Sequence, residues 1–272
     1  MEHILSMTMV DRLIGSAPFL YEGDFAAGIR RAAALGYTGV EMHATNPCGV
    51  DIQALQGALR ETGLRMTAMG TGRAYVNEGL SISDPNGAVR TAAVERLRDF
   101  IRTAGEFGSL LIVGCMRGNI RTPEELPETL ERLGESMLQV DACADSAGVT
   151  VVFEPINRYE NNFLCSAGEI CDFIHRYGLQ HTKVMLDTFH MNLEEADMAQ
   201  TIYACGEDLA YVHIADSNRL YPGGGHIPFA QLLDAFEKAG YRGAYSAECL
   251  PLPNKEAAQE RWLAAMRALL GG

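Results

Sequence analysis

The sequence predicts a single α/β domain spanning residues 1–272 and folded as a closed (β/α)8 barrel. Short β-rich runs alternate with longer amphipathic runs along the chain, and there are eight of each. No proline- or serine-rich linker and no low-complexity block divides them. The length of 272 residues agrees, because α/β barrels commonly run to about 250 residues as one domain.

The predicted strands are the short β-rich runs, which follow one another at intervals that leave room for a helix. In chain order they cover residues 3–9 (HILSMTM), 39–44 (GVEMHA), 65–71 (RMTAMGT), 109–115 (SLLIVGC), 150–156 (TVVFEPI), 183–189 (KVMLDTF), 210–216 (AYVHIAD) and 244–250 (AYSAECL).

The predicted helices are the amphipathic runs, several of which end in glycine one or two residues past the last apolar position, as helix C-caps do. They cover residues 25–35, 51–63, 88–108, 126–148, 166–178, 197–208, 229–240 and 254–272. The alternative is a doubly wound open sheet, which should carry a glycine-rich phosphate turn after its first strand. The run SMTMVDRLIG at that place has no such turn, so the barrel is favoured.

Composition excludes several kinds of partner. The formal net charge of −13 argues against nucleic acid, because no basic stripe is present to neutralise phosphates. No segment approaches the roughly 20 apolar residues of a membrane helix, and the N-terminus lacks the form of a signal peptide. The seven cysteines form no CxxC pair, which indicates reduced thiols rather than a structural zinc site. We therefore expect a cytoplasmic protein.

Four consecutive predicted strands end on residues that ligate metals: Glu154, Asp187, His213 and Glu248. The carboxyl ends of barrel strands lie on one ring, so these side chains should converge. Three carboxylates and one imidazole would be a costly cluster without a cation. Oxygen and nitrogen donors without thiolate suit Mn²⁺, Mg²⁺ or Co²⁺. The alternative, that each residue simply meets solvent or a neighbouring cation, fits one such residue better than four.

Further polar residues follow these strand ends on predicted βα-loops, where substrate contacts belong. They are Glu160 after the fifth strand, His190 after the sixth, and Arg219 and His226 after the seventh. His226 lies in a glycine-rich stretch, PGGGHIPF, which no strand feeds directly and no lysine follows, so it is not read as a phosphate loop.

The runs FEPINRYENNF, MLDTFHMNLEE, VHIADSNRLYPGGGHIPF and YSAEC resemble the xylose-isomerase-like TIM-barrel sugar isomerase/epimerase superfamily. They look most like the ketose 3-epimerases that act on tagatose, allulose (psicose) or ribulose. The resemblance is specific between residues 150 and 248 and looser before them. It implies one divalent metal ion, usually Mn²⁺ or Co²⁺, held by Glu154, Asp187, His213 and Glu248. It also implies substrate contacts from Glu160, His190 and Arg219, and a dimer or tetramer.

The resemblance implies epimerisation of a ketose at C3 through an enediolate, with Glu154 and Glu248 as acid and base on opposite faces. One departure concerns Arg117 and Arg121 in GCMRGNIR, together with Arg73. They are either solvated or paired loop charges, or contacts for an anionic substrate such as a sugar phosphate. Arg117 and His226 are thus candidate substrate contacts.

Other activities of the same barrel stay open at this point. They are an isomerase or epimerase of a sugar phosphate, a hydroxypyruvate-type isomerase, and an isomerase or dehydratase of cyclic polyols such as inosose. An endonuclease acting at abasic DNA would need more histidines at strand ends and a different charge. A non-catalytic sugar-binding barrel is disfavoured by the intact set of ligand and acid/base residues.

Overall fold

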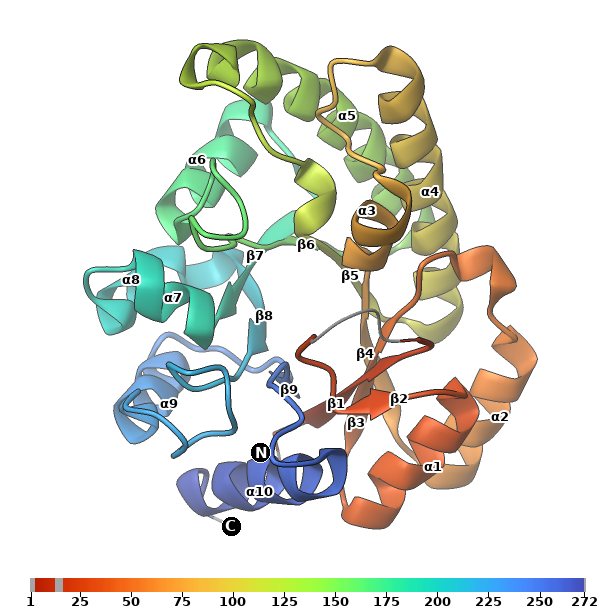
Figure 1. The fold of residues 1–272 in the computed structure, drawn as a ribbon, viewed down its shortest axis with the longest axis vertical. Coiled ribbons are helices and arrows are strands. Elements are labelled where there is room, and N and C mark those ends of the chain that lie inside the picture. Colours follow the sequence, from red (N-terminus) through yellow and green to blue (C-terminus); the bar gives the residue numbers. More distant parts are fainter. Residues whose placement is uncertain (1–2, 13–16, 272) are drawn as a thin grey trace.

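A computed structural model describes residues 3–12 and 17–271 and contains the closed parallel barrel that the sequence predicts (Figure 1). The ends of the predicted domain, residues 1–2 and 272, and residues 13–16 lie outside the described part. The barrel strands are β1 (Leu5–Val10), β3 (Gly39–His43), β4 (Arg65–Gly70), β5 (Leu110–Val113), β6 (Val151–Phe153), β7 (Thr182–Asp187), β8 (Leu209–His213) and β9 (Tyr245–Ala247). The ring closes because β1 pairs with both β3 and β9.

All eight predicted strands are confirmed, and one very short strand was not predicted. This strand, β2 (Tyr21–Glu22), pairs in parallel with the end of β1 outside the ring. The register places the strand ends on one rim: Asp187 is the Cα partner of His213, and His213 is the partner of Ser246. Glu154 and Glu248 directly follow the last residues of β6 and β9.

Helices surround the ring (Figure 1). Within the described residues they are α1 (Phe25–Leu35), α2 (Ile52–Thr62), α3 (Gly72–Glu78), α4 (Gly87–Phe107), α5 (Leu126–Ala147), α6 (Ala167–Tyr177), α7 (Thr188–Glu194), α8 (Met198–Cys205), α9 (Phe229–Lys238) and α10 (Lys255–Leu269). Single 3-10 turns are η1 (Pro47–Gly49), η2 (Cys115–Arg117), η3 (Pro123–Glu125) and η4 (Gly206–Asp208). The predicted glycine caps are confirmed where Gly36, Gly108 and Gly148 adopt left-handed backbone angles.

Two helices lie where the sequence predicted none, and α7 begins inside the run predicted as a strand to Phe189. α3 follows β4, and α7 follows β7 with no residue between them, because the side chain of Asp187 accepts a hydrogen bond from the backbone N–H of Phe189 and starts the helix. His190 therefore lies on a helix and not on a loop, which corrects its predicted placement.

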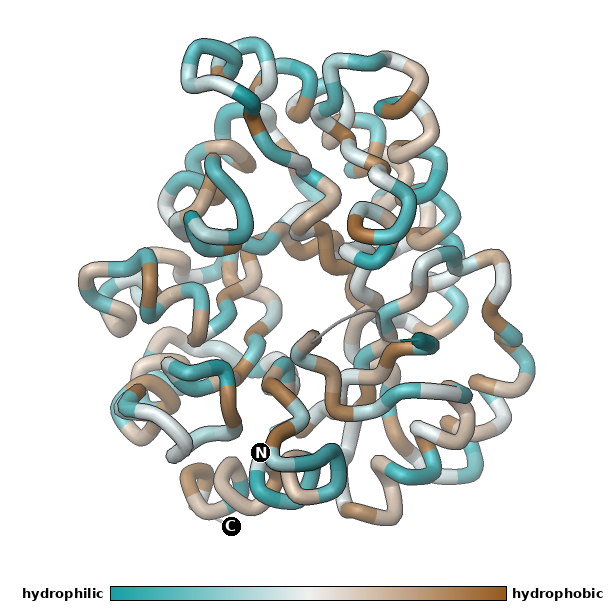
Figure 2. The backbone as a smooth tube through the Cα atoms, viewed as in Figure 1, coloured by the Kyte–Doolittle hydropathy of each residue, from teal (hydrophilic) through white to brown (hydrophobic). Residues whose placement is uncertain are grey.

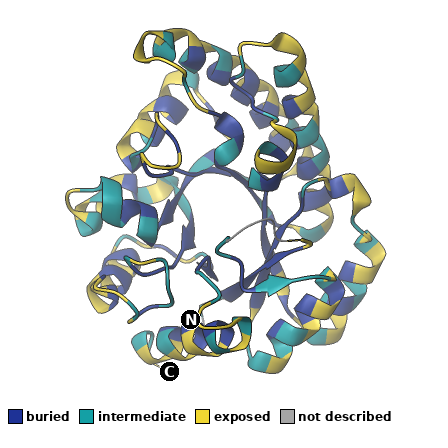
Figure 3. Cartoon of the chain, viewed as in Figure 1, coloured by how far each residue is buried: buried dark blue, intermediate teal, exposed yellow. Residues whose placement is uncertain are grey.

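The core has two parts, and the smaller part lies directly below the polar residues at the ends of the strands. The larger part packs the outer faces of the strands against the helices, whose far faces are exposed (Figure 3). Hydrophilic and hydrophobic residues alternate along these helices (Figure 2). The smaller part fills the inside of the barrel, since successive strand residues point to opposite faces. It consists of Ala68, Ile112, Val152, Met185, Tyr211 and Ala244. Glu154, Asp187 and His213 each stand two residues beyond a member of this plug, so they point inward directly above it.

None of the helices in the described part of the chain combines the length and apolarity required to cross a bilayer.

Candidate functional site

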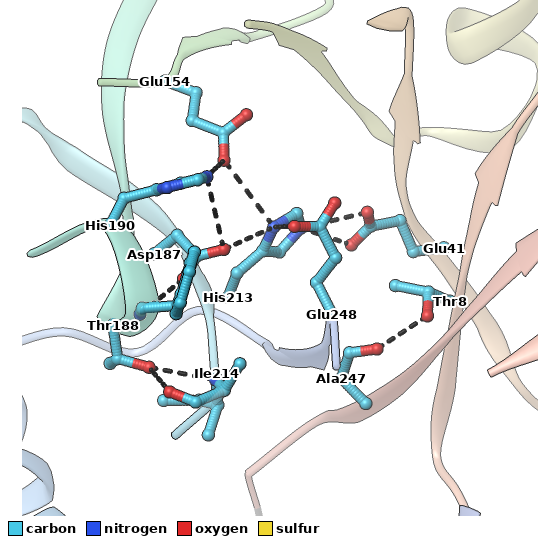
Figure 4. Close-up of polar contacts among 12 residues, drawn as sticks. Thr8, Glu41, Glu154, Asp187, Thr188, His190, His213, Ile214, Ala247 and Glu248 are labelled. Carbon is cyan, nitrogen blue, oxygen red and sulfur yellow. Dashed lines mark hydrogen bonds and ion pairs between the residues drawn. The ribbon is translucent and has the colours of Figure 1, made fainter. Parts of the chain in front are cut away.

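Glu154, Asp187, His213 and Glu248 converge above the apolar plug, as the sequence predicts (Figure 4). One ligand-type atom from each lies within 4.8 Å of the others, and all four side chains are buried. His213 Nδ1 lies 3.5 Å from Glu248 Oε2, 3.8 Å from Asp187 Oδ2 and 3.9 Å from Glu154 Oε1. The four consecutive strands β6 to β9 thus bring their polar ends to one point.

Three of these atoms are buried without a hydrogen-bond partner among the described residues: Glu154 Oε1, Asp187 Oδ2 and His213 Nδ1. Buried polar atoms are normally paired, because leaving one unpaired costs about 1–3 kcal/mol or more. A single divalent cation between them would satisfy all three. The donor set of carboxylate oxygens and one imidazole nitrogen fits Mn²⁺, Co²⁺ or Mg²⁺. This group of four residues is called the ligand group below.

The electrostatics of the ligand group also call for a cation. Burial raises the pKa of Glu154 well above its usual range, and the carboxylate of Glu248 raises it further. Burial and Glu248 together raise the pKa of Asp187 to about 7. Burial would raise the pKa of Glu248 too, but His213 and Arg219 hold it well below its usual value. A positive ion at the centre would offset both the burial and the repulsion that favour the protonated forms of Glu154 and Asp187.

The orientation of His213 is fixed by Glu41, a residue that the sequence analysis missed. Glu41 is fully buried on β3, and both of its carboxylate oxygens lie 3.0 Å from His213 Nε2. The hydroxyl of Tyr211 donates to Glu41 Oε2 at 2.7 Å, and the His43 ring lies against Oε1. Because Nε2 donates to Glu41, Nδ1 faces the ligand group as the free electron-pair donor.

The same neighbours stabilise the ionised form of Glu41. Burial opposes ionisation, but His213 and then His43 lower the pKa of Glu41 far below its usual value. A carboxylate within the buried strand GVEMHA, two residues before a histidine, was the signal available in the sequence. Glu41 was not predicted because it lies within a strand, whereas the expected ligands lie at strand ends.

Arg219 lies beside the ligand group and holds two carboxylates. Its Nη1 donates to Glu160 Oε1 and its Nη2 to Glu248 Oε2, each at 2.9 Å. The guanidinium lies over the Phe189 ring, 4.8 Å from its centroid. The structure therefore brings Glu160 and Arg219, both predicted substrate contacts, together at the edge of the site.

His190 is tied to the same group through Asn157. The Asn157 Nδ2 amide donates to Glu160 Oε1 at 3.0 Å and lies 2.6 Å from His190 Nδ1. Asn157 Oδ1 is occupied by the backbone N–H of Tyr159, so the amide nitrogen is the atom that faces the ring. Nδ1 accepts this bond, and Nε2 carries the proton, 3.9 Å from Glu154 Oε1. Burial and then Arg219 lower the pKa of His190 well below its usual value, which keeps the ring neutral.

A cavity of about 290 Å³ opens above these residues, at the low end of the roughly 300–1,000 Å³ of small-molecule sites. Asp187 and His190 are buried and are not among its lining residues. On one side it is lined by Glu154, Glu160, His213, Arg219 and Glu248, and on the other by Phe19, His43, Arg73, Val76 and Cys115.

Arg117 corrects the sequence analysis, since it is neither a solvated loop charge nor a cavity residue. It is fully buried, and its Nη1 donates to the backbone carbonyl of Glu154 at 2.6 Å. Its guanidinium lies 5.9 Å from the ring centroids of both Phe153 and Phe163. The turn η2 folds Arg117 inward to satisfy carbonyls at the end of the short strand β6. The structure therefore gives Arg117 a role in supporting the position of Glu154.

His226 is also misplaced by the sequence analysis. It is exposed, its Nδ1 lies 2.9 Å from Ser217 Oγ, and it does not line the cavity. The glycine-rich loop is held instead by Asp216, which accepts hydrogen bonds from the backbone N–H groups of Gly223 and Ile227. Arg121 is exposed as well, whereas Arg73 lines the cavity.

Comparison with known proteins extends the likeness over most of the chain. A family model described as xylose isomerase-like TIM barrel matches residues 29–269, which include strands β3 to β9. An L-ribulose 3-epimerase of Methylomonas sp. (strain DH-1) is 30% identical over 246 residues, covering 86% of this chain and 83% of that protein. A ketose 3-epimerase of Arthrobacter globiformis is 31% identical over 238 residues, covering 85% and 81%.

The solved structures agree. An L-ribulose 3-epimerase superposes on this chain with a TM-score of 0.83 at 26% sequence identity, covering 97% of this chain and 94% of that one.

Proposed function

Because the chain belongs to the xylose isomerase-like TIM barrel family, we propose that it is a divalent-metal-dependent epimerase that inverts C3 of a ketose. The observation that carries this proposal is the convergence of three unpaired buried atoms, Glu154 Oε1, Asp187 Oδ2 and His213 Nδ1, with Glu248 beside them. Relatives named as 3-epimerases of ketoses support the choice of reaction.

The ligand group would hold one ion, Mn²⁺ by preference, with Co²⁺ or Mg²⁺ as alternatives that the same donors suit. When bound, the ion would polarise the carbonyl and the adjacent hydroxyl oxygen of the ketose, which makes the proton at C3 more acidic. His213 can serve as a ligand through Nδ1 because Glu41 takes the hydrogen bond of its Nε2.

Glu248 is the base in one direction of the reaction. Arg219 donates to Glu248 Oε2 at 2.9 Å and favours its ionised form, so Glu248 can take the proton from C3 while the C–H electron pair becomes the C2–C3 double bond of the enediolate and the carbonyl electron pair moves to its oxygen. Glu154 comes from β6, three strands from β9 around the ring, and would return a proton to C3 from the opposite face. The centre is then inverted, and the two glutamates exchange roles in the reverse direction.

Glu160, His190 and Arg219 orient the substrate. His190 is neutral with its proton on Nε2, which lies 3.9 Å from Glu154 Oε1, so it would donate to a substrate oxygen only where that oxygen binds beside the carboxylate of Glu154. Arg219 supplies further donors from the cavity wall, and Glu160 holds Arg219 in place or accepts from a hydroxyl. We further propose that residues 1–272 form one catalytic domain. We also propose that the chain assembles into a dimer or tetramer.

The test is turnover of a panel of free ketoses, followed by NMR in deuterium oxide. Protein treated with a chelator should be inactive, and added Mn²⁺ or Co²⁺ should restore activity together with deuterium at C3 of the product. Full turnover by the metal-free protein, or inversion without any exchange at C3 under all conditions, would contradict the proposal.

A further inference from the structure

The cavity wall opposite His213 carries a buried cation for which the proposed reaction has no use. Arg73 is 4% exposed, lines the cavity and lies in the first turn of α3. Its Nη2 donates to the backbone carbonyl of Arg12 at 3.1 Å, and its Nε has no hydrogen-bond partner among the described residues. Within those residues, no carboxylate forms an ion pair with it.

The other arginine of the cavity makes the difference plain. Arg219 shares its charge between Glu160 and Glu248, each 2.9 Å away. Among the described residues, Arg73 has a single carbonyl acceptor instead. A guanidinium removed from water without a counter-charge is unfavourable unless a ligand supplies the missing acceptors. Among the described residues, Arg73 thus has unpaired N–H donors in the wall of the cavity, where a bound small molecule would contact them.

Arg73 is also held in position before any ligand arrives. The strand end before α3 is fixed where Thr71 Oγ1 donates to the Ile112 carbonyl at 2.8 Å. Later in the helix, Asn77 Nδ2 donates to Thr45 Oγ1 at 2.7 Å. These bonds hold the helix that carries Arg73, and the bond from Nη2 to the Arg12 carbonyl restrains the side chain, so a ligand would bind with little loss of side-chain freedom.

The topology decides which end of a substrate Arg73 would meet. β4, which leads into α3, is the third strand around the ring, and β8, which carries His213, is the seventh, so the two lie across the barrel from each other. The reacting carbons belong beside the ligand group. The remote end of a small ketose would then lie toward Arg73, in a cavity of about 290 Å³ that suits a single sugar unit.

We propose that Arg73 selects a ketose whose end remote from the reacting carbons carries an oxyanion, either a carboxylate or a phosphate. The planar guanidinium can offer parallel N–H donors to two oxygens of such a group. This inference rests on the proposed function for the placement of the reacting carbons, but it concerns a different part of the cavity.

The experiment compares matched substrates with the Mn²⁺-loaded protein: D-fructose and D-tagatose, their 6-phosphates, and the corresponding 6-carboxylates, D-fructuronate and D-tagaturonate. One anionic class should exceed its neutral parent in kcat/KM by about tenfold or more. The class preferred tells carboxylate from phosphate. Arg73→Met should remove the preference mainly through KM, and Arg73→Lys should retain part of it. The matched control is Arg121→Met, which removes an exposed arginine that does not line the cavity and should change nothing.

Calorimetric binding of the same compounds separates this inference from the proposed function. An anionic ketose that binds tightly to wild type and weakly to Arg73→Met, without turnover, supports Arg73 and contradicts the epimerase. Turnover of neutral and anionic ketoses with equal kcat/KM, unchanged in Arg73→Met, supports the epimerase and overturns the role of Arg73. Equal binding of neutral and anionic compounds overturns it as well. Melting temperatures of the variants establish that each is folded.

Discussion

The two halves of the barrel rim carry different chemistry. In the half formed by β6 to β9, four successive strands contribute the ligand group at or just after their last residues. In the half formed by β1 and β3 to β5, Glu41 lies within a strand and Arg73 lies on the short helix α3. The first half gathers groups that act on the reacting carbons. The second half supplies Glu41, which orients the ligand His213, and Arg73, which lines the opposite wall of the cavity.

The largest expected effect comes from removing the base of the first half. Glu248→Gln keeps the size of the side chain but cannot accept a proton, so kcat should fall by about 10²- to 10⁴-fold. Metal content after dialysis and the rate of deuterium exchange at C3 would be measured together. Glu160→Gln makes the same change from carboxylate to amide outside the acid/base pair. It serves as the control, and its kcat should fall less. A Glu248→Gln enzyme that still exchanges C3 at the wild-type rate would assign the base elsewhere.

The second largest effect is expected for Glu41, a residue of the second half that acts on a ligand of the first half. Glu41→Gln should weaken binding of Mn²⁺ by about 10- to 100-fold, because the amide no longer fixes the imidazole of His213 with a charged acceptor. Titration followed by electron paramagnetic resonance of free Mn²⁺ measures this directly. Tyr211→Phe removes only the hydroxyl that donates to Glu41 and should have a smaller effect. Unchanged metal affinity in Glu41→Gln would mean that the two halves act independently.

A third prediction uses pH to test the charge of the ligand group. The pKa of Asp187 is raised to about 7 in the metal-free protein, whereas an unfolded aspartate titrates near about 3.9. Between these values the folded protein binds a proton that the unfolded chain has released. Its free energy of unfolding therefore falls as pH rises through this window.

A bound cation replaces that proton, so its stabilising effect should grow in the same window. The difference in Tm between Mn²⁺-loaded and chelator-treated protein should accordingly increase from about pH 5 to about pH 8. Asp187→Asn, which cannot titrate and removes one of the ligands, should reduce both the stabilisation by Mn²⁺ and the part of its pH dependence that comes from Asp187. A difference that stays constant across this range would contradict the raised pKa.

The smallest effect is expected outside both halves. His226→Ala should change kcat/KM by no more than about twofold, because an exposed side chain bonded only to a neighbouring serine contributes little. Steady-state kinetics on the preferred ketose would measure it. A loss of tenfold or more would place the glycine-rich loop over the bound substrate.

The same division into halves explains what the sequence could predict. Glu154, Asp187, His213 and Glu248 each follow a short, largely apolar run, so the pattern along the chain is enough to place them on a common rim. The eight strands and the main helices follow from the same alternation of β-rich and amphipathic runs. These features depend on neighbours in sequence.

The remaining features depend on contacts between distant segments. Glu41 meets His213 across 172 positions of the chain, and no local pattern carries that contact. Arg117 and Arg73 both lie in polar stretches after strands, yet one is folded inward against backbone carbonyls and the other lines the cavity. Which way each arginine turns is decided by tertiary packing. The helix α7 was not predicted because Asp187 was interpreted only as a residue at the end of a strand. Its second role, as the N-cap of the helix that follows, was not recognised.

That second role of Asp187 accounts for the one aspartate in a ligand group whose other carboxylates are glutamates. Its Oδ1 accepts from the Phe189 N–H at 2.7 Å, and Oδ2 is left facing the other ligands. Capping the helix directly attached to it requires a short side chain, and aspartate is among the best N-cap residues. A glutamate here would reach the ion only by abandoning the first turn of α7, which carries His190. The choice between two acidic residues of nearly equal chemistry is thus made by chain geometry, and the shorter one keeps the substrate-orienting histidine aligned.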